Sequence, residues 1–150
     1  MRAKHYLLQI QKMDRMIQNK IAEAEHWKSI AAGTGLNTGG ERVQSQGSQQ
    51  KMADAVGRYI DIEKEITAAI DRLIDLRREI ILTIEQLKNV DHYDILYKRY
   101  VLYKEYFEIA DDMRKSQSWV AKAHGKALLD IQRILDERGA ADESTMFRLP

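Results

Sequence analysis

The sequence predicts an all-α protein: a long antiparallel helical hairpin, similar to a coiled coil, followed by a smaller C-terminal helical unit. Two observations lead to this prediction. The one proline is Pro150, so no interior position is barred from a helix by a proline ring. Apolar residues recur at steps of three and four along most of the chain, as they do in amphipathic helices.

Composition limits the class of protein further. Of the 150 residues, 44% are hydrophobic and 31% are charged, which permits a folded core under a large solvated surface. We find no signal-peptide pattern and no apolar run near the roughly 20 residues of a membrane-spanning helix. Cysteine is absent, which excludes disulfides and thiolate sites. We therefore expect a cytoplasmic protein that does not contact membranes.

The first expected domain, residues 1–90, is the hairpin. Its first helix should span 3–31, and a flexible loop should follow at 32–50, where five of the eight glycines lie. The second helix should span 51–89 and bury a narrow apolar stripe against the first. Part of this longer stripe remains for the C-terminal helices or for a second copy of the protein. The stripe comprises Met52, Val56, Tyr59, Ile62, Ile66, Ile70, Leu73, Leu76, Ile80, Ile84 and Leu87.

The second expected domain, residues 91–138, contains three helices, and residues 139–150 should form a disordered tail. Asp91 is expected to cap the helix over 91–101. The other two helices should span 104–113 and about 117–137. The expected inward residues are Ile95, Leu96, Tyr100, Phe107, Ile109, Ala110, Met113, Val120, Ala123, Ala127, Leu128, Ile131, Ile134 and Leu135.

The last two of these helices have the spacing of a helix-turn-helix. Ala110 is small where the second helix must pass close to the first, and Ser116 is a natural N-cap for the second helix. Ile109, Met113 and Val120 would anchor the two helices to each other. A plain bundle of short helices is the alternative interpretation, because such motif matches also arise by chance.

The expected turn departs from the usual motif at Arg114, where glycine is common. Either this turn needs no positive φ angle, or it carries about 1 kcal/mol of backbone strain. Lys115 replaces an apolar residue, and Trp119 occupies a place commonly held by threonine. These departures affect the fine docking geometry more than the fold.

Charge supports a DNA-binding role only locally. The whole chain carries +1, but 114–133 contains five basic residues and one acid, Asp130. Basic side chains on a recognition helix suit phosphate contact, although a solvated helix face has a similar composition. Gln117 can pair with adenine and Lys122 with guanine. The predicted DNA-binding residues are Arg114, Lys115, Ser116, Gln117, Ser118, Ala121, Lys122 and Lys126.

The segment 93–135, "YDILYKRYVLYKEYFEIADDMRKSQSWVAKAHGKALLDIQRIL", resembles sigma-70 region 4, the promoter-reading helix-turn-helix of bacterial sigma factors. The segments "YLLQIQKMDRMIQNK" and "GGERVQSQGSQQKMADAVGRYIDIEKEI" resemble small phage and prophage proteins of Gram-positive bacteria. Those proteins are described as sigma-70-like or late-gene transcription regulators of the ArpU and RinA kind. The resemblance implies a regulator that binds double-stranded promoter DNA. It also leaves open a partner-binding role for the glycine-rich loop.

Enzymatic chemistry has no support in the sequence. The four histidines are scattered without metal-ligand spacing, and the glycines do not form a phosphate-binding loop. We expect no catalytic residues, metal or cofactor. The hairpin should mediate self-association or contact with host RNA polymerase. Two alternatives remain: a coiled-coil adaptor with a degenerate helix-turn-helix, and a small-terminase-like DNA-packaging protein, although terminases usually place the DNA-binding unit first.

Overall fold

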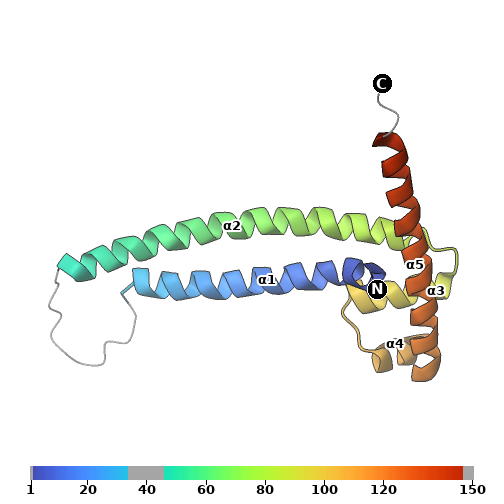
Figure 1. Cartoon of the computed structure of the whole chain (residues 1–150). Coiled ribbons are helices and arrows are strands. Elements are labelled where there is room, and N and C mark those ends of the chain that lie inside the picture. The colour runs from blue at the N-terminus through green and yellow to red at the C-terminus, as the bar shows by residue number, and fades with distance from the viewer. Residues whose placement is uncertain (1, 34–45, 147–150) are drawn as a thin grey trace. The chain divides into compact units, whose positions relative to one another are not determined.

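The structure, a computed structural model, describes residues 2–33 and 46–146, with the backbone alone for Gln46 and 143–146. In this part every regular element is a helix, which confirms the all-α prediction (Figure 1). None of the described helices combines the length and apolarity that crossing a membrane requires. Most of the predicted loop over 32–50, namely 34–45, lies outside the described residues.

Two long helices, α1 (Arg2–Ala31) and α2 (Gln46–Ile84), make up the N-terminal part. The chain divides into two compact units, and each helix contributes to both. One unit combines Met1–Lys12 with Ile74–Pro150 and is called unit 1 below; the other, unit 2, is Met13–Leu73.

In unit 2 the two helices lie side by side and antiparallel (Figure 1). Lys20 Nζ lies 2.8 Å from Glu65 Oε2, and the Arg58 guanidinium lies 5.1 Å from the centre of the Trp27 ring. As the residue number rises along α1 it therefore falls along α2. Buried residues recur every seven positions on each helix, as in a coiled coil. These residues are Ile17 and Ala24 on α1 and Ala55, Ile62 and Ala69 on α2.

Part of the predicted stripe on α2 is wrong. Met52, Val56 and Ile70 are each about two-fifths exposed, whereas Ala55 and Ala69 are buried. The stripe was assigned from large side chains, but small ones occupy buried positions wherever a facing side chain fills the space. The antiparallel register supports this explanation, because it places Ala69 near the large Ile17 of α1.

Unit 1 also contains α3 (Val90–Leu96), the π-helical turn η1 (Tyr97–Val101), α4 (Tyr106–Met113) and α5 (Gln117–Met146). The predicted cap of α3 is wrong: Asn89, not Asp91, accepts hydrogen bonds through its Oδ1, from the backbone N of Asp91 at 3.0 Å and of His92 at 3.2 Å. The second helix accordingly ends at Ile84, before the predicted residue 89. An asparagine at the start of a helix satisfies N–H groups that would otherwise be unpaired.

The core of unit 1 brings α3, α4 and α5 together through Ile95, Ile109, Ala110, Val120 and Ala123. The start of α1 joins the same unit, where the backbone N of Ala3 donates to Gln132 Oε1 at 2.9 Å. Tyr6 and Thr83 bring the end of α2 into the unit, because their hydroxyl oxygens lie 2.9 Å apart.

Phe107 was predicted to point inward, and this prediction is wrong because 58% of its surface is exposed. Tyr106 packs against the core instead, together with Met113. Positions 106, 109, 110 and 113 form the continuous 3–4 spacing of one helix face, and Phe107 lies one residue off it.

The last helix also differs from its predicted extent. Its predicted end is near Glu137, but α5 continues through Gly139 to Met146. A glycine inside a helix costs only about 1 kcal/mol, and the alanines at 140 and 141 that follow favour a helix. Of the tail predicted over 139–150, residues 139–146 are therefore helical, and residues 147–150 lie outside the described residues.

Candidate nucleic-acid interface

The turn between α4 and α5 is short and has defined hydrogen bonds. Its three residues are Arg114, Lys115 and Ser116. Arg114 adopts φ 54° and ψ 46°, the left-handed conformation. The backbone N of Lys115 donates to Ala110 O at 2.9 Å, and that of Arg114 donates to Asp111 O at 3.2 Å. This pair of hydrogen bonds is the Schellman motif, which usually places glycine at the left-handed position.

Of the two alternatives for Arg114, the structure therefore shows the strained one. A side chain in the left-handed region costs roughly 1 kcal/mol, because Cβ approaches the following carbonyl oxygen. The turn keeps an arginine there despite this cost. The strained backbone holds a cation beside the first turn of α5.

Small and branched residues fix the contact between α4 and α5. Ala110 and Val120 are both buried, as predicted, and Met113 is half-buried against the same cluster. Ser116 Oγ accepts a hydrogen bond from the backbone N of Trp119 at 3.1 Å, which confirms the predicted N-cap. A buried alanine on α4 leaves room for α5 to pass closely.

The structure brings the predicted DNA-binding residues together at the turn and the start of α5. All eight side chains are exposed. Ser118, Lys122 and Lys126 are four residues apart on α5, and so they lie along one face of the helix. The Lys115 ammonium lies 5.1 Å from the centre of the Trp119 ring, which orients this cation over the first turn.

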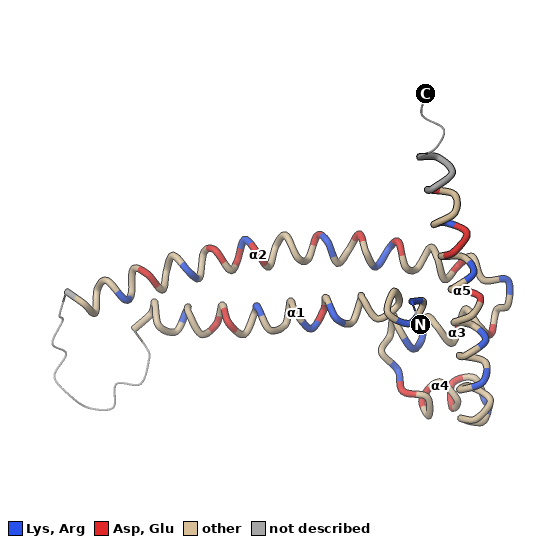
Figure 2. The backbone as a smooth tube through the Cα atoms, viewed as in Figure 1, with Lys and Arg blue, Asp and Glu red and all other residues tan. Residues whose placement is uncertain are grey.

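Two of the acidic side chains at α4 form ion pairs with nearby cations. Asp112 accepts from Lys104 Nζ at 2.5 Å and lies 3.9 Å from Lys98 Nζ, while Arg99 lies 3.3 Å from Glu105. The hydrogen bond from Lys104 is the main reason why the pKa of Asp112 is lowered. The acids of α4 are thus partly neutralised by nearby cations, and Figure 2 shows the two signs along the backbone.

The cations at the start of α5 are free of such partners. Within the described part of the chain, Arg114, Lys115, Lys122 and Lys126 form no salt bridge. Because all four are also exposed, this surface offers uncompensated positive charge to a polyanion.

Two residues of the same exposed region were missed by the sequence analysis. Gly125 lies between Lys122 and Lys126, and a Cβ added there would meet nothing within 4 Å. Leu129 follows one turn later with 56% of its surface exposed. A glycine inside a helix is less stable than alanine by about 1 kcal/mol, and at 125 a Cβ would have room among the described residues. The sequence shows a glycine inside a helical pattern, but only the structure shows that a side chain there would meet no neighbour.

A buried hydrogen-bonded cluster holds α5 in place. His124 Nε2 lies 2.7 Å from the Tyr100 hydroxyl, and His124 Nδ1 lies 3.1 Å from the Tyr106 hydroxyl. Burial, together with the charges of Arg99 and Lys4, lowers the pKa of His124 to about 4. Burial also raises the pKa of Tyr100 to about 12. The histidine is therefore neutral at pH 7, and it links η1, α4 and α5.

Among the described residues, no group of three or more histidine, aspartate or glutamate side chains is arranged so that it could bind a metal ion. Comparisons of the chain with family models, with curated proteins and with solved structures gave no match.

Proposed function

We propose that this protein is a transcription regulator that binds double-stranded promoter DNA through a helix-turn-helix formed by α4 and α5. The observation that carries the proposal is the group of four exposed cations around the start of α5, which form no ion pair within the described part of the chain. Such charges supply the salt-dependent part of DNA affinity by displacing counterions from phosphates.

The position of each residue on the turn or on α5 indicates which part of the DNA it would contact. The first turns of a recognition helix meet base edges in the major groove, which gives Gln117, Ser118, Ala121 and Lys122 the task of reading sequence. Arg114, Lys115 and Lys126 would contact phosphates. The three-residue turn, the buried Ala110 and the Ser116 cap support the motif, because they satisfy its steric and hydrogen-bonding needs. The resemblance to sigma-70 region 4 supports promoter DNA as the ligand.

The helical hairpin of α1 and α2 would serve protein contacts, either self-association or binding to RNA polymerase. Its support is the antiparallel pairing of the two helices in unit 2 and the apolar surface that α2 leaves exposed. A hairpin of this kind gives the protein a means of assembly that does not occupy the DNA-binding helix.

An adaptor without DNA affinity is a second candidate, favoured by an open groove on α4. The groove is lined by Lys104, Phe107, Glu108, Asp111 and Asp112, so it combines an exposed aromatic ring with acidic side chains. This composition suits a basic protein segment and repels DNA phosphates.

Selection from a pool of random DNA duplexes tests the leading proposal. The purified full chain should enrich a defined sequence, and Gln117→Ala should relax the preference at one base pair, at a cost of about 1–3 kcal/mol in discrimination. Glu108→Gln on α4, which leaves the start of α5 intact, is the matched control and should enrich the same sequence. Recovery of no preferred sequence, with no affinity for duplex DNA at low salt, would favour the adaptor.

A further inference from the structure

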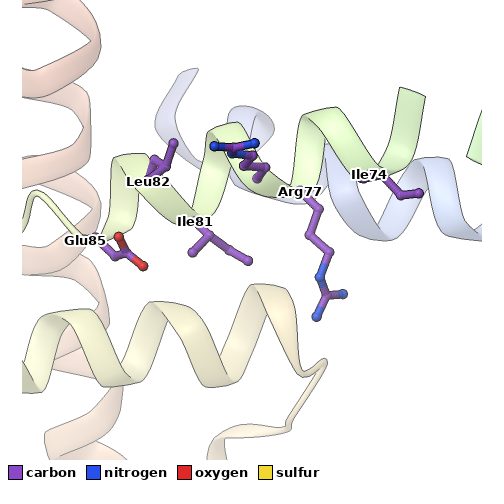
Figure 3. A pocket seen from close by; sticks show the side chains of 6 residues that line it. Ile74, Arg77, Ile81, Leu82 and Glu85 are labelled. Atoms are coloured by element: carbon purple, nitrogen blue, oxygen red, sulfur yellow. The ribbon is translucent and has the colours of Figure 1, made fainter. Parts of the chain in front are cut away.

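The end of α2, in unit 1, presents an open groove lined by apolar and mainly basic side chains. Ile74 and Leu82 are 59% and 50% exposed, and Ile81 is partly buried. Two arginines and one glutamate complete the lining, and neither arginine forms a salt bridge within the described part of the chain. The lining side chains project from successive turns (Figure 3) and are those of Ile74, Arg77, Arg78, Ile81, Leu82 and Glu85. Such a surface suits an acidic partner that also carries an apolar side chain.

The groove on α4, in the same unit, has this complementary composition. Phe107 is 58% exposed and lies among three acids and one lysine. Lys104 is held by Asp112, but Glu108 and Asp111 form no salt bridge with a described residue. The α4 groove is therefore acidic where the α2 groove is basic, and each of them leaves apolar surface in contact with water.

The two grooves also match in spacing. From Arg77 to Glu85 the lining residues of α2 follow one another at steps of one, three, one and three positions. The lining of the α4 groove has the same steps when it is followed backwards, from Asp112 to Lys104. Residues three and four positions apart share one face of a helix, so each groove follows one helix face. When the two helices are placed antiparallel, the two faces match position for position.

In the antiparallel orientation opposite charges meet at both ends of the contact. Lys104 meets Glu85 at one end, and two acids meet two arginines at the other. In a parallel orientation Lys104 would instead lie level with Arg77, and Asp112 with Glu85, so that like charges would repel. Antiparallel faces bring side chains of the same flank together. The facing pairs are then Arg77 with Asp111, Arg78 with Asp112, Ile81 with Phe107, Leu82 with Glu108, and Glu85 with Lys104.

Two lining residues outside the charge pairs fit the same arrangement. Glu108 faces the aliphatic Leu82, and Arg78 lies one turn away from that position. Ile74 lies beyond the last pair, level with the turn that follows α4. No lining residue of either groove therefore faces a like charge.

We propose that the α2 groove of one copy of the chain binds the α4 groove of a second copy, with the two helices antiparallel. The contact covers Phe107 with Ile81 of the other copy and forms three ion pairs. Within one chain both grooves are open, so the two faces do not cover each other there. A second copy is the occupant because it supplies a face that is complementary in charge, spacing and apolar content. Neither face contains a residue of unit 2.

The proposal extends the self-association role given to the hairpin and does not rest on DNA binding. Sedimentation of the full chain without DNA therefore tests it independently of the proposed function. The wild-type protein should self-associate as its concentration rises. Arg77→Asp and Asp111→Arg should each weaken the association about tenfold or more, because like charges then meet. Phe107→Ala, at an exposed position, should weaken it by removing the aromatic side chain from the contact.

The decisive sample is an equal mixture of the Arg77→Asp and Asp111→Arg proteins. The altered α2 face of the first is then opposite in charge to the altered α4 face of the second, and their unaltered faces match as in the wild type. The mixture should therefore associate although each protein alone does so poorly. Association through any other pair of surfaces would not be restored by mixing.

Matched controls are Arg72→Asp on α2 and Glu137→Arg on α5, which change exposed charges that line neither groove. Both should associate as the wild type does, and circular dichroism verifies that each variant is folded. A wild type that stays monomeric would overturn the proposal. So would association that tolerates both charge reversals, or a mixture that stays as weakly associated as its two components.

Discussion

His124 and Tyr100 form a buried hydrogen bond of 2.7 Å that joins the last helix to η1. The other ring nitrogen of His124 is bonded to Tyr106, so one nitrogen donates and the other accepts in the neutral ring. The bond places a titratable group in the core of the unit that carries the candidate DNA surface. Stability and function should therefore depend on its protonation state.

The pKa of His124 predicts that acid destabilises the fold. The unfolded chain binds a proton at this histidine below about its ordinary value of 6.5, whereas the folded protein resists protonation until about pH 4. Between these values the unfolded state holds more protons, so the free energy of unfolding should fall as the pH is lowered. Urea unfolding from pH 7 to pH 5 measures this slope. His124→Gln should flatten it, whereas His5→Gln, at an exposed position, should leave it unchanged.

The strained turn predicts opposite effects of one substitution on stability and on DNA affinity. Arg114→Gly should raise the free energy of unfolding by about 1 kcal/mol, because glycine adopts a positive φ without a steric clash. The same change removes a cation and should weaken DNA binding. Arg114→Ala is the control, since it removes the charge while keeping a Cβ. Equal stability of the glycine and alanine variants would contradict the strained conformation.

The glycine at position 125 suggests that DNA approaches the backbone of α5 closely at this residue. Because the space around this residue is empty, Gly125→Ala should stabilise the helix by roughly 0.5–1 kcal/mol in urea unfolding. If DNA approaches the backbone here, the added methyl group should also lower DNA affinity. Gly139→Ala is the matched control on the same helix, at another position where a Cβ meets nothing, and it should stabilise without affecting DNA. Unchanged affinity of Gly125→Ala would show that the ligand does not approach this residue.

Much of the fold could be predicted because large side chains and capping residues carry strong local signals. Ile109, Val120 and Ser116 have the burial and the hydrogen bond that their spacing indicated. Ala55 and Ala69 could not be recognised as core residues, because burial of an alanine depends on a facing side chain far away in sequence. The left-handed conformation of Arg114 could not be predicted, since the sequence does not show which φ a turn adopts.

The residues of the candidate site could be predicted from the sequence, but the ion pairs among the charged side chains around it could not. The sequence placed acids before the turn and bases after it. It could not show that Asp112 is held by Lys104, while Lys122 and Lys126 form no ion pair with any described residue. Such partners come from different elements, and their distances depend on how the elements pack. Likewise, Gly125 can be recognised as a possible point of DNA contact only when the space beside its backbone is known.

The salt dependence of DNA binding tests the central claim most directly. The affinity of the full chain for a DNA duplex, measured by fluorescence anisotropy over a series of salt concentrations, should fall steeply as salt rises. Lys122→Ala and Lys126→Ala should weaken binding at low salt, and a variant that loses a phosphate contact should reduce the logarithmic slope by about 0.9. Arg72→Ala, far along the sequence on α2, should behave as wild type. Absence of salt-sensitive binding, or binding that both lysine variants leave intact, would contradict the account.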